Sequence, residues 1–262
     1  MPELPDVEVF RRYFDTHAAG REVADLTTDA PRLVADTKPE ALAGLLSGRR
    51  LGEGYRHGKH LYIPVTGTDG WLAVHFGMTG HFRHVPVGEA LPRHGHLVLV
   101  LAGGDRLALV IPRKLGHVRW LTDLAANLAD LGPDPWAMTF EAFREQTEGR
   151  RGQVKCWLMD QSAIAGIGNV YSDEILLHAG IHPKHRLESL DEAALQRIHG
   201  AMGHVLAEAV AAEVDPDRMP ADLLVPRRGK GAHCPLCGSA METLKACGRT
   251  AYRCPCCQPE PA

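Results

Sequence analysis

The chain begins with the stretch Met1–Gly20, MPELPDVEVFRRYFDTHAAG, which predicts a helix anchored within a few residues of the N-terminus. Pro5 suits the first position of a helix, and the carboxylate of Asp6 is favoured in the first turn. Apolar residues recur on one face, at Val7, Phe10, Phe14 and Ala18. A helix placed here holds the terminus still, whereas most termini fray.

Pro2 and Glu3 carry candidate chemistry at this terminus. Because the second residue is small, we expect Met1 to be removed, which leaves Pro2 with a free secondary amine. A neutral α-amino group, with a pKa of about 7.7 to 8.0, can attack a carbonyl carbon, and proline then gives a charged iminium. Glu3 could exchange protons with the reacting atoms. The alternative is that Pro2 only permits removal of Met1 and that Glu3 is a solvated acid.

The composition is that of a globular protein. The chain has 262 residues, 45% of them hydrophobic, which is enough for one large or two ordinary domains and a small module. It contains no apolar run of membrane-spanning length and no signal-peptide pattern, so a cytoplasmic location is expected. The formal net charge of -3 argues weakly against a nucleic-acid partner, but residues 226–257 are locally basic. The six cations there, against Glu242 alone, are Arg227, Arg228, Lys230, Lys245, Arg249 and Arg253.

Short strands with turn signals between them dominate residues 21–130. The clearest are 61–65, 71–76, 96–101 and 106–111. Glycine-rich breaks at 67–70 and 103–105 predict hairpins, and together these segments predict a β-sandwich or barrel. From about residue 138 the pattern is helical, with helices expected over 139–147 and 191–214. Pro133, Pro135 and the basic segment 150–152 mark the expected linker.

Three sites in the strand-rich half are candidates for function. Lys59 follows a glycine that would allow a ligand to approach closely. Met78 lies between Gly77 and Gly80 and could project from a tight loop, and residues 112–116 place two cations and Leu115 after a strand. The alternative for each is ordinary: a solvated lysine, a core methionine and an exposed loop.

Residues 158–174 contain a possible phosphate-binding turn. One helix is expected to end near Gly166 and a second to start at Asn169 as its N-cap, with acids in its first turn. Glycines before a helix N-terminus expose backbone N–H groups that can cradle a phosphate. A dinucleotide fingerprint is excluded because the preceding strand and a third glycine are missing. The segment therefore predicts either a helical hairpin that grips a nucleic-acid phosphate or purely structural turn glycines.

Cysteine spacing gives the strongest single signal. Cys234, Cys237, Cys254 and Cys257 form two C-x2-C pairs separated by sixteen residues, which fits a four-thiolate structural zinc site. Cys256 could compete as a ligand, although the two-residue spacing favours Cys257. Disulfides are the less expected use of these pairs in a cytoplasmic chain. Cys247 lies in the intervening hairpin and Cys156 stands alone, and both are predicted to be free thiols. The metal would hold the hairpin around residues 248–250, and so would present Arg249.

These features, in this order, resemble the formamidopyrimidine-DNA glycosylase and endonuclease VIII family of base-excision repair enzymes. The start Met1–Pro5 is similar to the formamidopyrimidine branch, 160–169 to the helix-two-turn-helix, and the cysteine pairs to the terminal zinc finger. The resemblance implies an α+β multi-domain fold. Its parts would be an N-terminal catalytic β-sandwich domain with an N-terminal helix over 1–135, a helical domain over 136–225 and a zinc finger over 226–262.

The resemblance also implies an activity, that of an N-glycosylase of the hydrolase class and an abasic-site lyase. Pro2 would attack C1′ of the damaged nucleoside and expel the base, with Glu3 as acid and base. The iminium acidifies the C2′ protons, so β-elimination cuts the strand with help from Lys59. Arg249 matches the finger arginine of δ-elimination and phosphate binding.

The remaining implied roles concern DNA. The implied DNA-binding residues are His75, His94, Arg113, Arg151, Lys155 and Asn169, and those that fill the gap left by a flipped nucleotide are Met78, Arg113 and Leu115. One structural zinc ion and double-stranded DNA with damaged bases or abasic sites are the implied cofactor and partner. The protein would be a monomer, cytoplasmic and nucleoid-associated in a prokaryotic-type cell.

Several positions depart from the family pattern. Asp6, Ile111 and Leu115 replace a glutamate, an aspartate and a phenylalanine, and the stretch 214–225 is short for the loop that covers 8-oxoguanine. We therefore expect 8-oxoguanine not to be the preferred lesion, which leaves oxidised pyrimidines, formamidopyrimidines, abasic sites or a more specialised lesion. The main alternative function is a non-catalytic DNA-binding zinc-ribbon protein. A zinc-dependent hydrolase is disfavoured because four cysteines leave the metal no open position.

Overall fold

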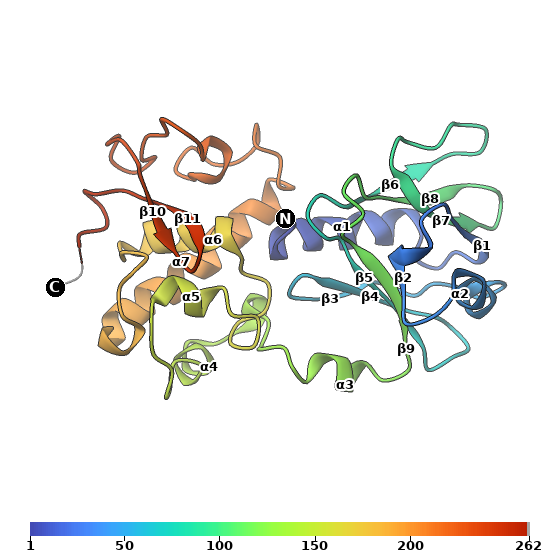
Figure 1. Ribbon diagram of the computed structural model, residues 1–262, viewed down its shortest axis with the longest axis horizontal. Helices are drawn as coiled ribbons and strands as arrows, with labels where there is room; N and C mark the ends of the chain where they lie inside the picture. The colour runs from blue at the N-terminus through green and yellow to red at the C-terminus, as the bar shows by residue number, and fades with distance from the viewer. Residues whose placement is uncertain (261–262) are drawn as a thin grey trace. The chain divides into compact units, whose positions relative to one another are not determined.

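The computed structural model describes residues 1–260, and the chain divides into two compact units (Figure 1). The first unit comprises Met1–Pro2 and Asp6–Asp130, and the second comprises Glu3–Pro5 and the residues from Leu131 onward. The division falls at 130/131 and sets Glu3–Pro5 with the later part of the chain, so the three-domain boundaries expected from the sequence stay a prediction. Within residues 1–260 no helix is both long and apolar enough to cross a membrane.

The first unit is built on two sheets. A four-stranded antiparallel sheet has the order β1 (Val23–Thr28), β7 (Gly95–Leu101), β8 (Arg106–Val110) and β6 (His81–Val85). A five-stranded sheet has the order β2 (Val34–Ala35), β9 (His117–Leu121), β5 (Trp71–His75), β4 (His60–Pro64) and β3 (Tyr55–His57). Short helices η1 (Pro31–Leu33), α2 (Pro39–Leu46) and α3 (Leu124–Leu128) complete the unit. The predicted sandwich and its four clearest strands are confirmed.

Helix α1 (Leu4–His17) forms where the apolar periodicity predicts it. Val7, Phe14 and Ala18 are fully buried in the core of the first unit, which they share with inward-facing residues of both sheets. On its polar side, Glu8 accepts hydrogen bonds from Arg11 and from Arg56 of β3. Burial alone would raise the pKa of Glu8, but these arginines hold it below its ordinary value. The helix is therefore fixed to the sheet by apolar packing and by a partly buried ion-pair cluster.

The second unit is helical with one hairpin. Its helices are η2 (Pro135–Ala137), α4 (Phe140–Glu145), α5 (Val154–Leu158), α6 (Asn169–Ala179), η3 (Leu187–Ser189), α7 (Glu192–Ala211) and η4 (Val225–Arg227). Strands β10 (Glu242–Ala246) and β11 (Arg249–Arg253) pair as a hairpin, drawn in red beside α6 in Figure 1. Its two turn residues, Cys247 and Gly248, have φ of 54° and 69°, as a tight hairpin turn requires.

Three predictions about residues 158–174 are wrong in detail. The first helix, α5, ends at Leu158 and not near Gly166, because turns occupy the residues that follow. The N-cap of α6 is Gly168, and Asn169 is already helical. Asp173 and Glu174 therefore lie beyond the first turn of α6, so the compensating carboxylate at its N-terminus must come from elsewhere in the chain.

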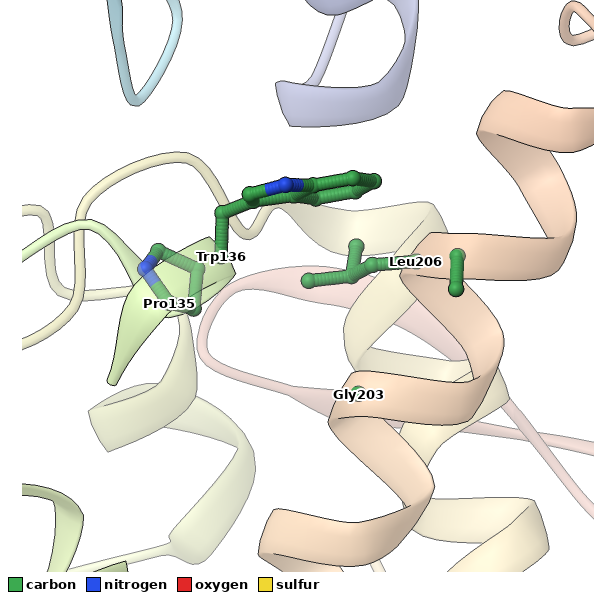
Figure 2. A pocket seen from close by; sticks show the side chains of 5 residues that line it. Pro135, Trp136, Gly203 and Leu206 are labelled. Carbon is green, nitrogen blue, oxygen red and sulfur yellow. The ribbon is translucent and has the colours of Figure 1, made fainter. Parts of the chain in front are cut away.

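The exposed side of α7 carries a shallow apolar groove. Figure 2 shows Pro135 and Trp136 of η2 on one side of it and Gly203 and Leu206 of α7 on the other, with the indole ring reaching toward the helix. Trp136 is 45% exposed. The ring thus packs η2 onto α7 while leaving one face to solvent.

Cys156 and Cys247, predicted to be free thiols, instead form a disulfide, with their Cα atoms 5.5 Å apart. The two cysteines are 91 residues apart in the sequence, and only the fold brings the hairpin turn to α5. The prediction of two free thiols is therefore wrong. The bond fixes the turn that directly precedes Arg249.

We expect the disulfide to be measurable by thiol counting. Of the seven cysteines, only five should react with a thiol reagent in denaturant and chelator without reductant, and all seven after reduction. Cys156→Ser should lower the free energy of unfolding in urea by up to about 4 kcal/mol, because the denatured chain loses a long cross-link. Reductant should remove this difference between wild type and variant. Seven reactive thiols before reduction would contradict the assignment.

Candidate active site and nucleic-acid interface

The carboxylate of Glu3 lies at the N-terminus of α6. Its oxygens accept hydrogen bonds from the backbone N–H groups of Gly168 (2.7 Å), Val170 (2.9 Å) and Tyr171 (3.2 Å), and Glu3 is only 2% exposed. The first N–H groups of a helix have no partner within the helix, and the helix dipole favours an anion there. Glu3 therefore supplies the carboxylate that α6 lacks in its own first turn.

Gly168 is required by this arrangement. A Cβ atom built on it would lie 2.5 Å from both Cδ and Oε1 of Glu3. Only glycine lets the helix start approach the carboxylate so closely. The Leu4 N–H also donates to the carbonyl of Gly166 at 3.0 Å, so the backbone beside Glu3 is held to the same turn.

Pro2 precedes Glu3 directly and lines a pocket of about 340 Å³ in the first unit. The other residues that line this pocket are Met1, Asp6 and Phe10 of α1, and 78–81. Pro2 therefore lies at a cavity of the first unit, next in sequence to a carboxylate that is fixed by hydrogen bonds.

The residues expected to fill a gap in DNA lie on two adjoining loops. A Cβ atom on Gly77 would lie 2.5 Å from the nitrogen of Gly116 and 2.6 Å from the carbonyl carbon of Leu115, so the two loops pack backbone to backbone. Met78 is 36% exposed and Leu115 53% exposed, and Arg113 is exposed on the same loop as Leu115. The structure therefore places the two loops that carry these three residues side by side.

Histidine rings lie next to one another across β4, β5 and β9. The ring centroid of His75 lies 5.1 Å from that of His60 and 5.2 Å from that of His117. Burial, followed by repulsion from neighbouring histidines, lowers the pKa of both His60 and His75 from 6.5 to about 4. These rings are uncharged at neutral pH, so His75 can offer a neutral hydrogen-bonding and stacking surface there.

Other predicted residues of the interface are placed as follows. Lys59 is 8% exposed and lies in the turn between β3 and β4, next to His60. His94 has φ of 67°, and its carbonyl accepts from the N–H of Ile111, which holds the segment before β7 in a fixed conformation. Arg151 is exposed beside Arg150, whose guanidinium pairs with Asp160 at 2.9 Å.

Lys155 lies in a different environment from the one expected of a DNA contact. It is fully buried, and its Nζ donates to Asp173 Oδ1 (2.7 Å), Ser172 Oγ (2.7 Å) and the Asn169 carbonyl (3.1 Å). Burial lowers its pKa despite the Asp173 carboxylate. Lys155 therefore orients the first turns of α6 from within.

Asp173 joins the helices to the hairpin. Besides Lys155, its carboxylate accepts from Arg228 Nη2 at 2.7 Å and from the backbone N–H of Tyr252 in β11 at 3.2 Å. The Arg228 guanidinium lies 4.4 Å from the centroid of the Tyr252 ring. From the sequence, Asp173 was predicted to be an ordinary first-turn acid and Arg228 one of six cations in a basic segment. The basic stretch was the only signal for Arg228, and no local pattern identified its partner.

The hairpin places its turn against the start of α6. The Asn169 side-chain amide donates to the carbonyl of Thr250 at 3.2 Å, next to Arg249, which is exposed. Within the described residues, Asn169 Oδ1 is buried without a hydrogen-bond partner. Two side chains of the predicted interface, Asn169 and Arg249, therefore lie on neighbouring segments of one surface.

Four sulfur atoms gather at the base of the hairpin. The Sγ atoms of Cys234, Cys237, Cys254 and Cys257 all lie within 4.8 Å of one another and could hold a metal ion. The separations are 3.8 Å for Cys234–Cys257 and 3.4 Å for Cys237–Cys254. Cys256 is exposed and lies outside this group as the structure describes it.

Comparison with known protein families gives the class of the protein. A model of the formamidopyrimidine-DNA glycosylase N-terminal domain matches residues 1–118, and a model of the formamidopyrimidine-DNA glycosylase H2TH domain matches residues 131–218. The chain therefore belongs to the formamidopyrimidine-DNA glycosylase and endonuclease VIII family.

Individual relatives agree with this assignment. The chain is 36% identical to the formamidopyrimidine-DNA glycosylase of Geobacter metallireducens, with 98% of this chain and 100% of the relative covered. It is 35% identical to that of Moorella thermoacetica, with 98% and 92% covered. Among solved structures, that of MutM in complex with DNA containing carbocyclic 8-oxo-G matches with a TM-score of 0.85 at 27% identity, covering 99% of this chain and all of the other. Lactococcus lactis Fpg in complex with abasic-site DNA matches with a TM-score of 0.86 at 27% identity, covering 98% and 100%.

We expect Gly168→Ala to destabilise the second unit by about 2 kcal/mol or more. The added methyl group would displace the Glu3 carboxylate and leave buried N–H groups of α6 without an acceptor, at about 1–3 kcal/mol each. Urea unfolding measures the effect. Gly200→Ala on α7 is the matched control, because nothing described lies within 4 Å of its Cβ position, and alanine there should stabilise by about 0.5–1 kcal/mol. Equal stability of the two variants would contradict this role of Gly168.

The low pKa values of His60 and His75 predict a lower free energy of unfolding in mild acid. Their folded-state pKa of about 4 lies below the unfolded value of 6.5, so between these values the unfolded chain binds more protons than the folded one. The free energy of unfolding should therefore fall as the pH drops from about 6.5 to about 4. His60→Gln should flatten this slope, whereas His81→Gln, at an exposed position, should leave it unchanged. Denaturant titrations at a series of pH values test this, and equal slopes in all three proteins would refute it.

Proposed function

We infer that the protein is a bifunctional DNA glycosylase and abasic-site lyase of base-excision repair, which removes damaged bases through a Schiff base on its N-terminal proline. The observation that carries this inference is the buried Glu3 carboxylate, fixed by three N–H donors of α6 directly after Pro2. A nucleophile and a carboxylate adjacent in sequence can both act on one sugar, provided that the carboxylate is held in place. The family supplies the reaction class, and the structure supplies the means of positioning.

The proposed reaction starts with attack of the Pro2 nitrogen on C1′. The C1′–N bond to the base breaks, and the base leaves with the bonding electrons and takes the proton that the amine loses. The nitrogen lone pair then forms the C1′=N bond of an iminium as the C1′–O4′ bond breaks, and O4′ takes up a proton from Glu3. The iminium acidifies C2′, so loss of a C2′ proton and cleavage of the C3′–O bond cut the strand. Glu3 serves as the acid and base around the sugar, and Lys59 assists this elimination. Arg249 binds the second phosphate, whose departure completes δ-elimination.

The four-cysteine group fits one structural zinc ion. Tetrahedral coordination with Zn–S bonds of about 2.3 Å places sulfur atoms about 3.8 Å apart. The separations of 3.8 Å and 3.4 Å in the structure are close to this value. Because four thiolates fill a tetrahedral site, the ion would take no part in the reaction. It would hold together the ends of the segment that presents Arg249.

Double-stranded DNA with damaged bases or abasic sites is the proposed substrate. Arg113, His75 and His94 of the first unit and Arg151 and Asn169 of the second would bind DNA. Met78 and Leu115, with Arg113, would occupy the gap left by the flipped nucleotide. Lys155 would act by positioning the Asn169 carbonyl, because its ammonium group is buried. The shortness of 214–225 supports lesions other than 8-oxoguanine. The bacterial origin of the relatives supports a cytoplasmic enzyme. Resemblance to the family supports a monomer.

Borohydride trapping tests the mechanism, because borohydride reduces a Schiff base to a stable amine. The wild-type protein should form a covalent complex with duplexes bearing an abasic site or 5-hydroxyuracil, mapping to the N-terminal peptide, and less with 8-oxoguanine. Glu3→Gln should slow trapping by about 10²- to 10⁴-fold, the range for loss of an acid–base group. Pro2→Gly should also reduce it.

Two controls separate the mechanism from folding and binding. A form with one extra residue before Pro2 turns the nucleophile into an amide, so it should bind the duplex but form no complex. Glu40→Gln, at an exposed acid on α2, should trap like wild type. Tight lesion binding without trapping by the wild-type protein would instead favour the non-catalytic DNA-binding alternative.

A further inference from the structure

A second group of metal-binding side chains lies in the second unit, apart from the cysteines. His178 at the end of α6, His204 in the middle of α7 and Asp222 in the segment after α7 each direct one donor atom to a common point. These three atoms all lie within 4.8 Å of one another. His204 Nε2 and Asp222 Oδ2 are 3.7 Å apart, and the rings of His178 and His204 have centroids 5.6 Å apart.

The key observation is the state of His178. Its side chain is 10% exposed, and its Nε2 is buried without a hydrogen bond to any described residue. Burial alone would lower the pKa of His178, but Glu174 Oε1, which lies 3.2 Å away without the geometry of a hydrogen bond, raises it through its charge. That oxygen already accepts the backbone N–H of Leu224 at 2.9 Å. A buried ring nitrogen without a hydrogen-bond partner destabilises the folded state unless another group or an ion binds it.

The electrostatic surroundings favour a cation. Glu174 is 1% exposed, and its carboxylate adds a negative charge beside the negative charge of Asp222. His178 lies in the last turn of α6, where the helix dipole also favours positive charge. Arg197 donates to the carbonyl of Ala179 at 3.1 Å and offsets part of this negative potential. The site therefore offers two histidines and one carboxylate as ligands, with a second carboxylate nearby. Late first-row metals prefer such a donor set.

We propose that His178, His204 and Asp222 form a second, exchangeable binding site for zinc or a similar divalent transition-metal ion. Three protein ligands leave a tetrahedral ion one open position, which water fills. His204 and Asp222 are each 46% exposed, so their side chains have room to move inward to bonding distance around an ion. The site differs in kind from the cysteine group, because it has nitrogen and oxygen ligands and lies open to solvent.

The proposed ion would join three segments of the second unit. It would tie the end of α6 and the middle of α7 to residue 222, which directly precedes the backbone that Glu174 holds through Leu224 and Val225. Those residues lead into the basic segment that contains Arg228. Binding of the ion should therefore stabilise the connection between α7 and the hairpin module. The alternative is a simple ion-pair cluster, in which the histidines bind only protons.

Zinc titration of the full-length protein tests the proposal. Protein with its cysteine group loaded is dialysed against buffered zinc, and bound metal is counted by mass spectrometry. The wild type should take up a second equivalent of zinc. Loss of a residue that only hydrogen-bonds to a metal ligand typically weakens metal binding by about 10- to 100-fold. His204→Ala should weaken zinc binding by more than this, because His204 is itself a proposed ligand. Asp222→Asn should weaken it too. The thermal midpoint of the wild type, but not of His204→Ala, should rise over the same zinc range.

Two further measurements make the result decisive. Cobalt at the second site should give weak visible bands without the intense thiolate-to-metal absorption of the cysteine group. His185→Ala removes a half-buried histidine outside the cluster and should keep the second equivalent. Equal uptake by wild type and His204→Ala, or equal loss in His185→Ala, would overturn the proposal in favour of an ion-pair cluster or of adventitious surface binding.

Discussion

The carboxylate of Glu3 at the N-terminus of α6 is the interaction on which the rest of the structure depends. It joins residue 3 to residues 168–171 through three backbone hydrogen bonds, so the start of the chain is fixed to a helix 165 positions later. A reactive terminal amine needs this kind of support, because an unattached terminus would sample many positions. The same bonds satisfy α6, whose own first turn contains no acid. One carboxylate thus stabilises a helix and fixes the residue next to the proposed nucleophile.

Helix α6 is buried on nearly every side, yet it carries three consecutive polar residues, Ser172, Asp173 and Glu174. Each has partners on another segment: Ser172 and Asp173 bind Lys155 of α5, Asp173 also binds Arg228 and β11, and Glu174 binds the backbone at 224–225. Removing one partner of such a buried pair typically costs about 3–5 kcal/mol, because a charge remains unpaired. The polar face of α6 therefore determines where the hairpin module and its Arg249 are attached.

The sequence predicted what depends on local pattern. Alternation and glycine-rich breaks located the strands of the sandwich, helical periodicity located α1 and α7, and paired cysteines predicted the metal-binding group. Prediction from the sequence failed where a contact joins residues that lie far apart in the chain. Lys155 was assigned to DNA by family resemblance, a role that stays a prediction, and no local pattern indicated that its ammonium group is buried against Asp173. The Cys156–Cys247 bond was missed because only the hairpin brings the two residues together.

The same distinction explains why the sequence predicted the candidate site residues but not the contacts that hold them in place. Pro2 and Glu3 are adjacent, so the dipeptide alone indicates their proposed chemistry. The position of the Glu3 carboxylate depends on Gly168, where any Cβ atom would lie 2.5 Å from the carboxylate. A glycine before a helix normally signals a turn or an exposed phosphate-binding loop. Here the backbone N–H groups of Gly168, Val170 and Tyr171 already hold the carboxylate of Glu3, so the chain itself supplies an anion at this helix start. In the proposed interface this leaves the side chain of Asn169, and not these occupied N–H groups, to act on a DNA phosphate.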